Sequence, residues 1–214
     1  RSTVDPVVLD LLLRAGRTWL QGIAGAVGDS ARVDSARMLF ERVLARDPQN
    51  PGAIAGIGYV LNISFIRGWD VPGLTPAEVQ ARADSLNRLA MSLDSTLLNS
   101  WNMVLINRIY LEDDFEGARE AIERMISLDS GYAEGYRDRG IYRQELEGDL
   151  KGALEDFQLS VTLDPSVQRL NSLAAGLMAA RRYPEAAAAL QRSIALRESA
   201  PARTRLIAAY DKLG

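Results

Sequence analysis

The stretch Ala153–Pro165, ALEDFQLSVTLDP, decides the fold because its outline recurs along the chain. A small residue, Ala153, is followed four residues later by the aromatic Phe157, and Asp164-Pro165 closes the segment. Related outlines are Ala36 with Phe40 and Asp47-Pro48, Ala83 with Leu93-Asp94-Ser95, Ala118 with Leu128-Asp129-Ser130, and Ala186 with Leu190. Successive alanines are 47, 35, 35 and 33 residues apart. A repeat of this length predicts stacked helical units, each too small to fold alone.

A second helix is predicted ahead of each alanine after the first, because apolar and small residues recur there at helical spacing. These sets are Ile54, Ile57, Gly58 and Leu61; Trp101, Val104 and Leu105; Tyr136, Gly140 and Tyr142; and Leu170, Leu173, Ala174 and Leu177. With a period near 34, the pattern resembles the tetratricopeptide repeat (TPR) family over about residues 31 to 214. The resemblance implies an all-α fold, a right-handed superhelical solenoid of antiparallel helix pairs.

The repeats organise the chain into three parts. We expect an extra helix and a connection over residues 1–30, about five repeats over 31–200, and a capping helix over 201–214. The interval of 47 residues is longer than the period, and its surplus predicts an insertion near residues 64–76, where prolines and glycines gather. The predicted helices are 6–22, 35–45, 51–66, 76–93, 97–112, 115–128, 132–147, 150–163, 167–181, 183–197 and 201–213.

The amino-acid composition argues against several classes of function. A net charge of −3 argues against a general nucleic-acid binder, whose affinity comes from a basic surface. The absence of Cys and His removes thiol nucleophiles, the usual zinc ligands and the commonest general base. Neither the glycine clusters nor the acidic clusters match a nucleotide or calcium motif. We therefore expect no enzyme activity, no cofactor and no metal. No apolar run is long enough to predict a membrane-spanning helix. The lack of cysteine is compatible with either the cytoplasm or the periplasm of a bacterium.

The resemblance also implies a binding surface. In TPR proteins the first helix of each pair lines a concave groove that holds a protein or peptide. The positions that correspond to that groove are Tyr59, Asn62, Asn99, Asn102, Ile106, Arg137, Ile141, Gln144 and Asn171. Asn102, Arg137 and Asn171 occupy equivalent places on three helices, where amides can pair with a peptide backbone and the guanidinium with a carboxylate. A merely hydrated polar face is the alternative.

Two further features bear on this groove. The family's clamp for the carboxyl ends of chaperones uses Lys and Asn at places that here hold Tyr59, Ile106, Ile141 and Ala175, which argues against a chaperone adaptor. Trp69, in the predicted insertion, either forms a lid over one end of the groove or anchors its loop to the neighbouring helices.

A narrower resemblance concerns the setting of the repeats. The segments Asp5–Leu20, Ala36–Val60 and Leu89–Asp94 are similar to TPR regions of bacterial multidomain signalling proteins. These are class III adenylate cyclases, winged-helix regulators of the CadC type and Ser/Thr kinases. The resemblance implies a non-enzymatic protein-interaction module of a signalling or regulatory protein. The alternatives are a self-association module that forms a homodimer, and a small-molecule sensor near Trp69 and Tyr59.

Overall fold

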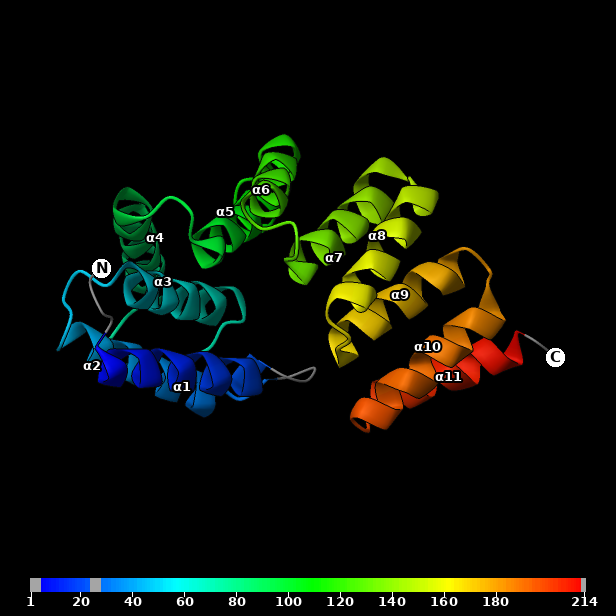
Figure 1. Ribbon diagram of the computed structural model, residues 1–214, viewed down its shortest axis with the longest axis horizontal. Helices are drawn as coiled ribbons and strands as arrows, with labels where there is room; N and C mark the ends of the chain where they lie inside the picture. Colours follow the sequence, from blue (N-terminus) through cyan, green and yellow to red (C-terminus); the bar gives the residue numbers. More distant parts are fainter. Residues whose placement is uncertain (1–4, 24–27, 213–214) are drawn as a thin grey trace. The chain divides into compact units, whose positions relative to one another are not determined.

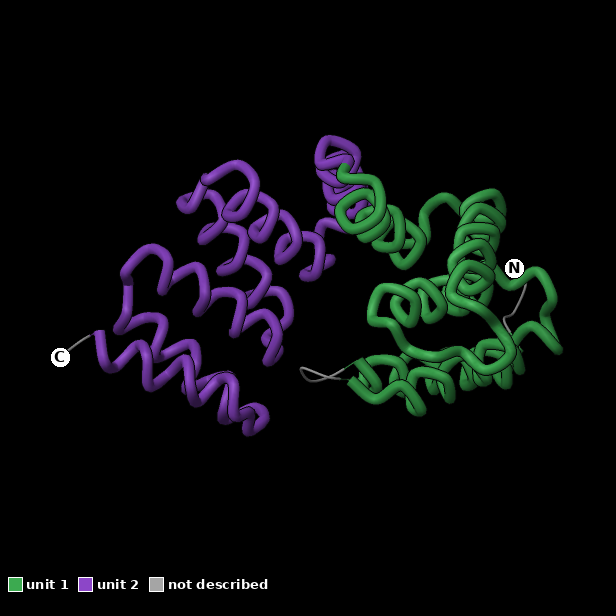
Figure 2. Tube along the Cα trace, turned by 180° about the vertical axis from the view of Figure 1, so that it is seen from behind, with its two compact units in different colours: residues 1–113 green, residues 114–214 purple. Residues whose placement is uncertain are grey.

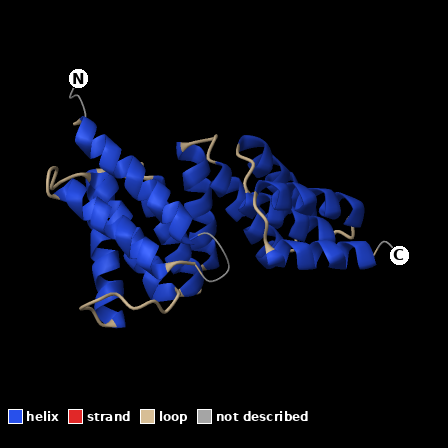
Figure 3. Cartoon of the chain, turned by 90° about the horizontal axis from the view of Figure 1, so that it is seen from below, coloured by secondary structure: helices blue, strands red, loops and turns tan. Residues whose placement is uncertain are grey.

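The computed structural model describes residues 5–23 and 28–212. Within these ranges the chain is helical throughout and contains no strand (Figure 3). It divides into two compact units, residues 1–113 and 114–214 (Figure 2). The fold class predicted from the repeats is therefore confirmed. Residues 24–27 of the predicted connection and 213–214 of the predicted capping helix lie outside the described residues.

The described residues of the first unit form five helices (Figure 1). They are α1 (Pro6–Ile23), α2 (Ser30–Leu44), α3 (Pro51–Ile66), α4 (Pro76–Leu93) and α5 (Leu98–Tyr110). α1 packs with α2 and α3 packs with α4, while α5 lies against α3 and α4. The ranges predicted for α3 and α4 coincide with those observed. α2 begins five residues before its predicted start, because the Asp29 carboxylate accepts a hydrogen bond from the Arg32 backbone N–H at 3.0 Å and caps the helix there.

The second unit contains six α-helices and one π-helical turn. They are α6 (Phe115–Leu128), α7 (Ala133–Tyr142), the π-turn η1 (Arg143–Glu147), α8 (Leu150–Leu163), α9 (Val167–Ala179), α10 (Tyr183–Leu196) and α11 (Ala200–Asp211). α7 pairs with α8 and α9 pairs with α10, while α6 packs on α7 and α11 on α10. The one helix predicted over residues 132–147 is thus an α-helix that ends in a wider turn.

The boundary between the units falls inside one predicted repeat. The helix pair expected over residues 97–128 has its first member, α5, in the first unit and its second, α6, in the second. Asp113 adopts a left-handed backbone conformation, with φ of 50°, and Asp114 caps α6 by accepting a hydrogen bond from the Gly117 N–H at 2.9 Å.

Six of the described helices begin at a short polar side chain that accepts a hydrogen bond from a backbone N–H that the helix leaves unpaired: α2, α3, α4, α6, α8 and α9. Thr75 and Glu78 form a reciprocal capping box at the start of α4. Asp149 caps α8 through the Gly152 N–H, at 2.9 Å. The predicted starts of α4 and α8, at residues 76 and 150, agree with these caps.

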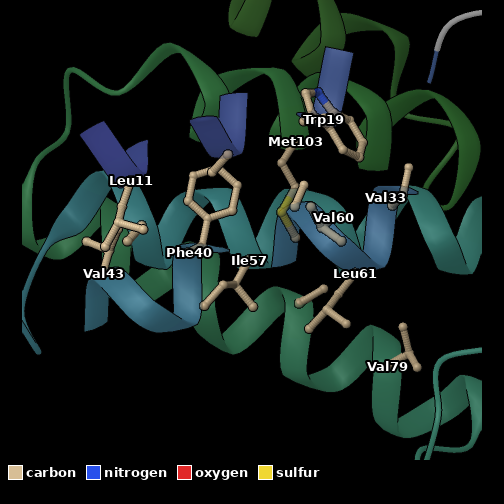
Figure 4. Packing of buried hydrophobic residues seen from close by; sticks show 14 of the residues in the cluster. Leu11, Trp19, Val33, Phe40, Val43, Ile57, Val60, Leu61, Val79 and Met103 are labelled. Atoms are coloured by element: carbon tan, nitrogen blue, oxygen red, sulfur yellow. The ribbon is translucent and has the colours of Figure 1, made fainter. Parts of the chain in front are cut away.

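The core of the first unit surrounds α3, whose side chains are buried on nearly every side (Figure 4). The Phe40 ring of α2 lies against Gly56 of α3, so closely that a Cβ on Gly56 would come within 2.6 Å of the ring. Leu11, Val43 and Ile57 belong to the same cluster. A glycine on the buried helix therefore sets how closely the aromatic ring can approach it.

The core of the second unit repeats this arrangement with one ring between two glycines. Phe157 of α8 is 2% exposed. A Cβ on Gly140 of α7 would lie 2.6 Å from its ring, and a Cβ on Gly176 of α9 would lie 2.9 Å from it. The ring thus joins α7, α8 and α9, and side chains larger than hydrogen are excluded at both contacts.

We expect Gly140→Ala to destabilise the second unit. The added methyl would also meet the Ala153 carbonyl oxygen at 3.1 Å, and backbone cannot move away as a side-chain end can. Overpacking of this kind costs about 1–3 kcal/mol, more than the ~1 kcal/mol that alanine gains over glycine in a helix. Thermal unfolding followed by circular dichroism measures the difference.

Gly16→Ala in α1 is the matched control. A Cβ there would meet no atom of the chain within 4 Å, so at low-micromolar concentration only the helix preference remains and the variant should be more stable by about 0.5–1 kcal/mol. Equal behaviour of the two variants would contradict the packing described for Phe157.

Candidate functional site

The first unit carries a row of side chains that crosses its odd-numbered helices. Trp19 of α1 and Tyr59 of α3 lie with ring centroids 5.0 Å apart and planes tilted by 56°. The Tyr59 hydroxyl donates a hydrogen bond to Asn102 Oδ1 of α5, at 3.1 Å. Asn102 is buried and Tyr59 is half-buried. The two predicted residues are therefore brought together, with Tyr59 covering Asn102.

Asn62 lies deeper in the same unit. It is wholly buried, and its amide donates a hydrogen bond to Asn107 Oδ1 at 2.6 Å. The Asn107 amide in turn donates to Asp84 Oδ1 of α4 at 3.2 Å. This chain of polar contacts joins α3, α5 and α4, and it holds Asn107 in place. The other predicted positions on α5 are more accessible, since Asn99 is exposed and Ile106 is half-buried.

Trp69 lies in the connection between α3 and α4. Together with Val71 and Leu74 it packs against the first unit's core. The Arg67 guanidinium lies 5.1 Å from the centroid of its ring, and a Cβ on Gly28 would come within 2.7 Å of that ring. These contacts agree with an anchoring role for Trp69, the alternative that the sequence offered beside a lid.

The second unit carries a cluster of charges between α7 and α9, which we call the charge cluster. It consists of Glu134, Arg137, Asp138, Asp164 and Arg169. Arg137 Nη2 lies 2.8 Å from Glu134 and 2.7 Å from Asp138, while Arg169 lies 3.2 Å from Glu134 and 2.7 Å from Asp164. The Asp138 side chain is 10% exposed and that of Arg169 is 14%. Arg137, a predicted site residue, thus joins two carboxylates on its own helix.

Burial governs the electrostatics of this cluster. Removal from water raises the pKa of Asp138 and of Glu134 above their ordinary values, because it disfavours the charged form. Arg137 and Arg169 favour the charged form, but they offset burial only in part. Both carboxyl groups are therefore already desolvated, so an incoming hydrogen-bond donor or cation would not have to remove water from them.

Ile141 stands beside the charge cluster. It follows Asp138 by three residues and Glu134 by seven, which places all three on one face of α7. Its side chain is 40% exposed. The next predicted residue, Gln144, lies in the π-turn and donates a hydrogen bond to Glu145 at 2.7 Å. An apolar side chain and buried carboxyl groups therefore share this face.

Asn171 is the predicted residue on α9. Its Oδ1 accepts a hydrogen bond from the Ser193 hydroxyl of α10 at 2.9 Å. The contact ties the two helices of one pair together, and Asn171 is half-buried.

Sequence reasoning missed several members of these sites, among them Trp19, Asp138 and Arg169. The i, i+3, i+4 spacing of Glu134, Arg137 and Asp138 is visible in the sequence and marks charges on one helix face. No comparable signal links Arg169 to α7, because that contact spans 35 residues. Within the described part of the chain, no three Asp or Glu residues gather as metal ligands. No helix in that part has both the length and the apolar character needed to cross a membrane.

Solved structures with the same helix arrangement are TPR proteins. A thermophilic TPR protein from Thermus thermophilus, TTC0263, is 17% identical with a TM-score of 0.67, covering 95% of this chain and 98% of that one. The fold is a TPR fold. YrrB, described as a TPR protein with an unusual peptide-binding site, is 16% identical with a TM-score of 0.50, covering 98% and 92%.

A larger assembly contains a similar stretch. A chain of the APC/C hetero-tetramer Cut9-Hcn1 is 17% identical with a TM-score of 0.68, and the match covers 97% of this chain and 37% of that one. No protein-family model and no curated protein matches the sequence. At these identities the likeness establishes the TPR fold alone.

The raised pKa values predict how the charge cluster affects stability. The folded protein holds protons on Glu134 and Asp138 more tightly than the unfolded chain does, so their contribution to the free energy of unfolding grows as pH falls through the raised pKa values. Relative to Glu134→Gln/Asp138→Asn, whose side chains stay neutral, the wild type should gain melting temperature between pH 7 and about 4.5. Circular dichroism melts at each pH measure this difference.

Glu116→Gln, in the same unit, should change stability with the opposite dependence on pH. Hydrogen bonds from Arg119 lower the pKa of Glu116, so the advantage of the wild type over this variant should shrink as pH falls. A difference for the double variant that does not change with pH would contradict the burial described for the cluster.

Proposed function

We propose that the chain is a non-enzymatic interaction module that binds an extended segment of a partner protein, and that the face of α7 and α9 in the second unit is a principal contact. The observation that carries the proposal is the charge cluster beside exposed Ile141. Protein interfaces usually combine apolar contact with hydrogen bonds to polar groups around it, and this face offers both.

The chemistry of this face favours one class of peptide. The charge cluster holds three carboxyl groups and two guanidinium groups, so its net charge is negative when all are ionised. A basic side chain of the partner would find desolvated carboxylates, with which charge-assisted hydrogen bonds are strong. An apolar side chain next to it would cover Ile141. We therefore infer a segment in which a basic residue adjoins an apolar one.

Other predicted residues take part in two ways. In the second unit Arg137 keeps Glu134 and Asp138 in position, and Gln144 and Asn171 extend the polar surface along η1 and α9. In the first unit Tyr59, Asn99 and Ile106 offer a second contact surface, which buried Asn62 and Asn102 support from beneath. YrrB, described as carrying a peptide-binding site, supports such a role for a protein of this fold.

We place the module in a bacterial signalling or regulatory protein, on the resemblance of its sequence to TPR regions of such proteins. In that setting the partner segment belongs either to another domain of the same protein or to a second protein. The chemistry inferred for the segment is the same in both cases.

Random peptides displayed on phage provide a probe that needs no knowledge of the partner. Peptides selected on the purified chain should be enriched in a basic residue beside an apolar one, and their affinity is measured by fluorescence anisotropy. Ile141→Ala and Glu134→Gln should each weaken binding about tenfold, because each removes one contact of about 1.5 kcal/mol. Circular dichroism confirms that the variants fold.

Leu159→Ala is the matched control for Ile141→Ala. Leu159 lies on α8 and is 39% exposed, nearly the same as Ile141, so its loss changes apolar surface equally without touching this face of α7. Selected peptides that bind all three variants as tightly as the wild type, or a selection that yields no peptide, would exclude this binding face.

A further inference from the structure

Helix α1 has two apolar stripes instead of one. The first stripe faces the core and consists of Val8, Leu11, Ala15, Trp19 and Gly22. The second, which we call the outer stripe, consists of Leu9, Leu13, Gly16 and Leu20. Its leucines are 48%, 58% and 63% exposed, in chain order. Three open leucines in a row on one helix form a patch that folding of the unit leaves uncovered.

The spacing of the outer stripe indicates what covers it. Its members follow one another at intervals of four, three and four residues, the interval of the a and d positions at which one helix packs along another. A Cβ at Gly16 would meet no atom within 4 Å. The space above Gly16 is therefore open to a side chain from a facing helix.

The stripe is also symmetric about its own centre, which lies between Leu13 and Gly16. When a second copy of α1 is laid against the first in the opposite direction, Leu9 faces Leu20 of the second copy. Leu13 then faces Gly16 of the second copy, where the open space admits it. Each leucine thus meets either a leucine or the gap over the glycine, and the arrangement is the same from both copies, as a two-fold interface requires.

Charges beside the stripe match the same arrangement. Asp10 and Arg17 each follow a stripe residue directly, so they flank it on one side, at the e positions of the heptad. Equivalent e positions meet across an antiparallel pair, and Asp10 then faces Arg17 of the second copy, twice by symmetry. Within one helix the two residues are separated by about 10.5 Å, too far to pair. In a parallel pair the e positions face g positions, which here are Leu12 and Trp19.

We propose that this chain forms a two-fold symmetric homodimer through the outer stripe, with the two α1 helices antiparallel. The stripe extends over about 16 Å of helix, so the interface is small and the dimer should dissociate on dilution into the micromolar range. The proposal is independent of peptide binding, because α1 belongs to the first unit and the charge cluster to the second.

Sedimentation velocity over a concentration series tests the dimer directly. The wild-type chain should change from monomer to dimer as its concentration rises from micromolar to hundreds of micromolar, and Leu13→Asp should remain monomeric throughout. Leu89→Asp is the matched control, because Leu89 lies on α4 and is 47% exposed. It should dimerise as the wild type does. A wild type that stays monomeric, or a Leu13→Asp variant that still dimerises, would overturn the proposal.

A charge swap tests the antiparallel register. Asp10→Arg and Arg17→Asp each place like charges opposite one another and should weaken the dimer about tenfold, whereas the double variant Asp10→Arg/Arg17→Asp should recover to within about threefold of the wild type. A mixture of the two single variants should form heterodimers in preference to either homodimer. In the heterodimer, both pairs place an arginine of one variant opposite an aspartate of the other.

Asp10 also lies 3.7 Å from Arg14 of its own helix, so recovery of the double variant is interpreted together with the preference of the mixed single variants for heterodimers, which an effect within one helix cannot produce. A double variant that remains as weak as the single variants, with its helical content unchanged by circular dichroism, would overturn the antiparallel pairing. A dimer affinity that Asp10→Arg does not change would also overturn the antiparallel pairing.

Discussion

The contact between an aromatic ring and a glycine on the facing helix is the constraint on which each unit depends. Phe40 lies against Gly56 in the first unit, and Phe157 lies between Gly140 and Gly176 in the second. Because nothing larger than hydrogen fits at these points, the spacing between neighbouring helices, within a pair and between pairs, is set by the backbone itself. Helices held at that spacing leave their remaining faces to solvent, and those faces carry the residues available for binding.

The polar and aromatic contacts of the two units differ in their chemistry. In the first, an aromatic and amide row links Trp19, Tyr59 and Asn102, with the amide covered by the ring. In the second, Arg137 and Asp138 belong to ion pairs largely removed from water. Desolvation there raises the pKa of the Asp138 carboxyl, so the second unit is distinguished by buried charge and the first by aromatic and amide contacts. The proposed peptide binding uses the second unit, and the proposed dimer uses α1 of the first. Neither proposal involves catalysis.

Much of the fold could be predicted because local signals and packing agree. Thr75 and Glu78 mark the start of α4 within four residues, and the apolar spacing along Ala153–Pro165 indicates a buried helix face. The candidate faces were harder to predict. Tyr59 and Asn102 were named separately from sequence, but their hydrogen bond spans 43 residues, and no local pattern indicates that one covers the other.

The sequence by itself determined that this chain is a helical repeat protein, where most of its helices begin and end, and which helix faces are apolar, because caps and periodicity act over a few residues. Only the tertiary structure decided that the repeats divide into two units after Asp113, that Arg169 of α9 contacts Glu134 of α7, and that Asn62 is interior while Ile141 is open. The physical reason is that burial and ion pairing depend on neighbours distant in the chain. Which distant residues become neighbours depends on how the helices pack, and the local sequence pattern does not specify that packing.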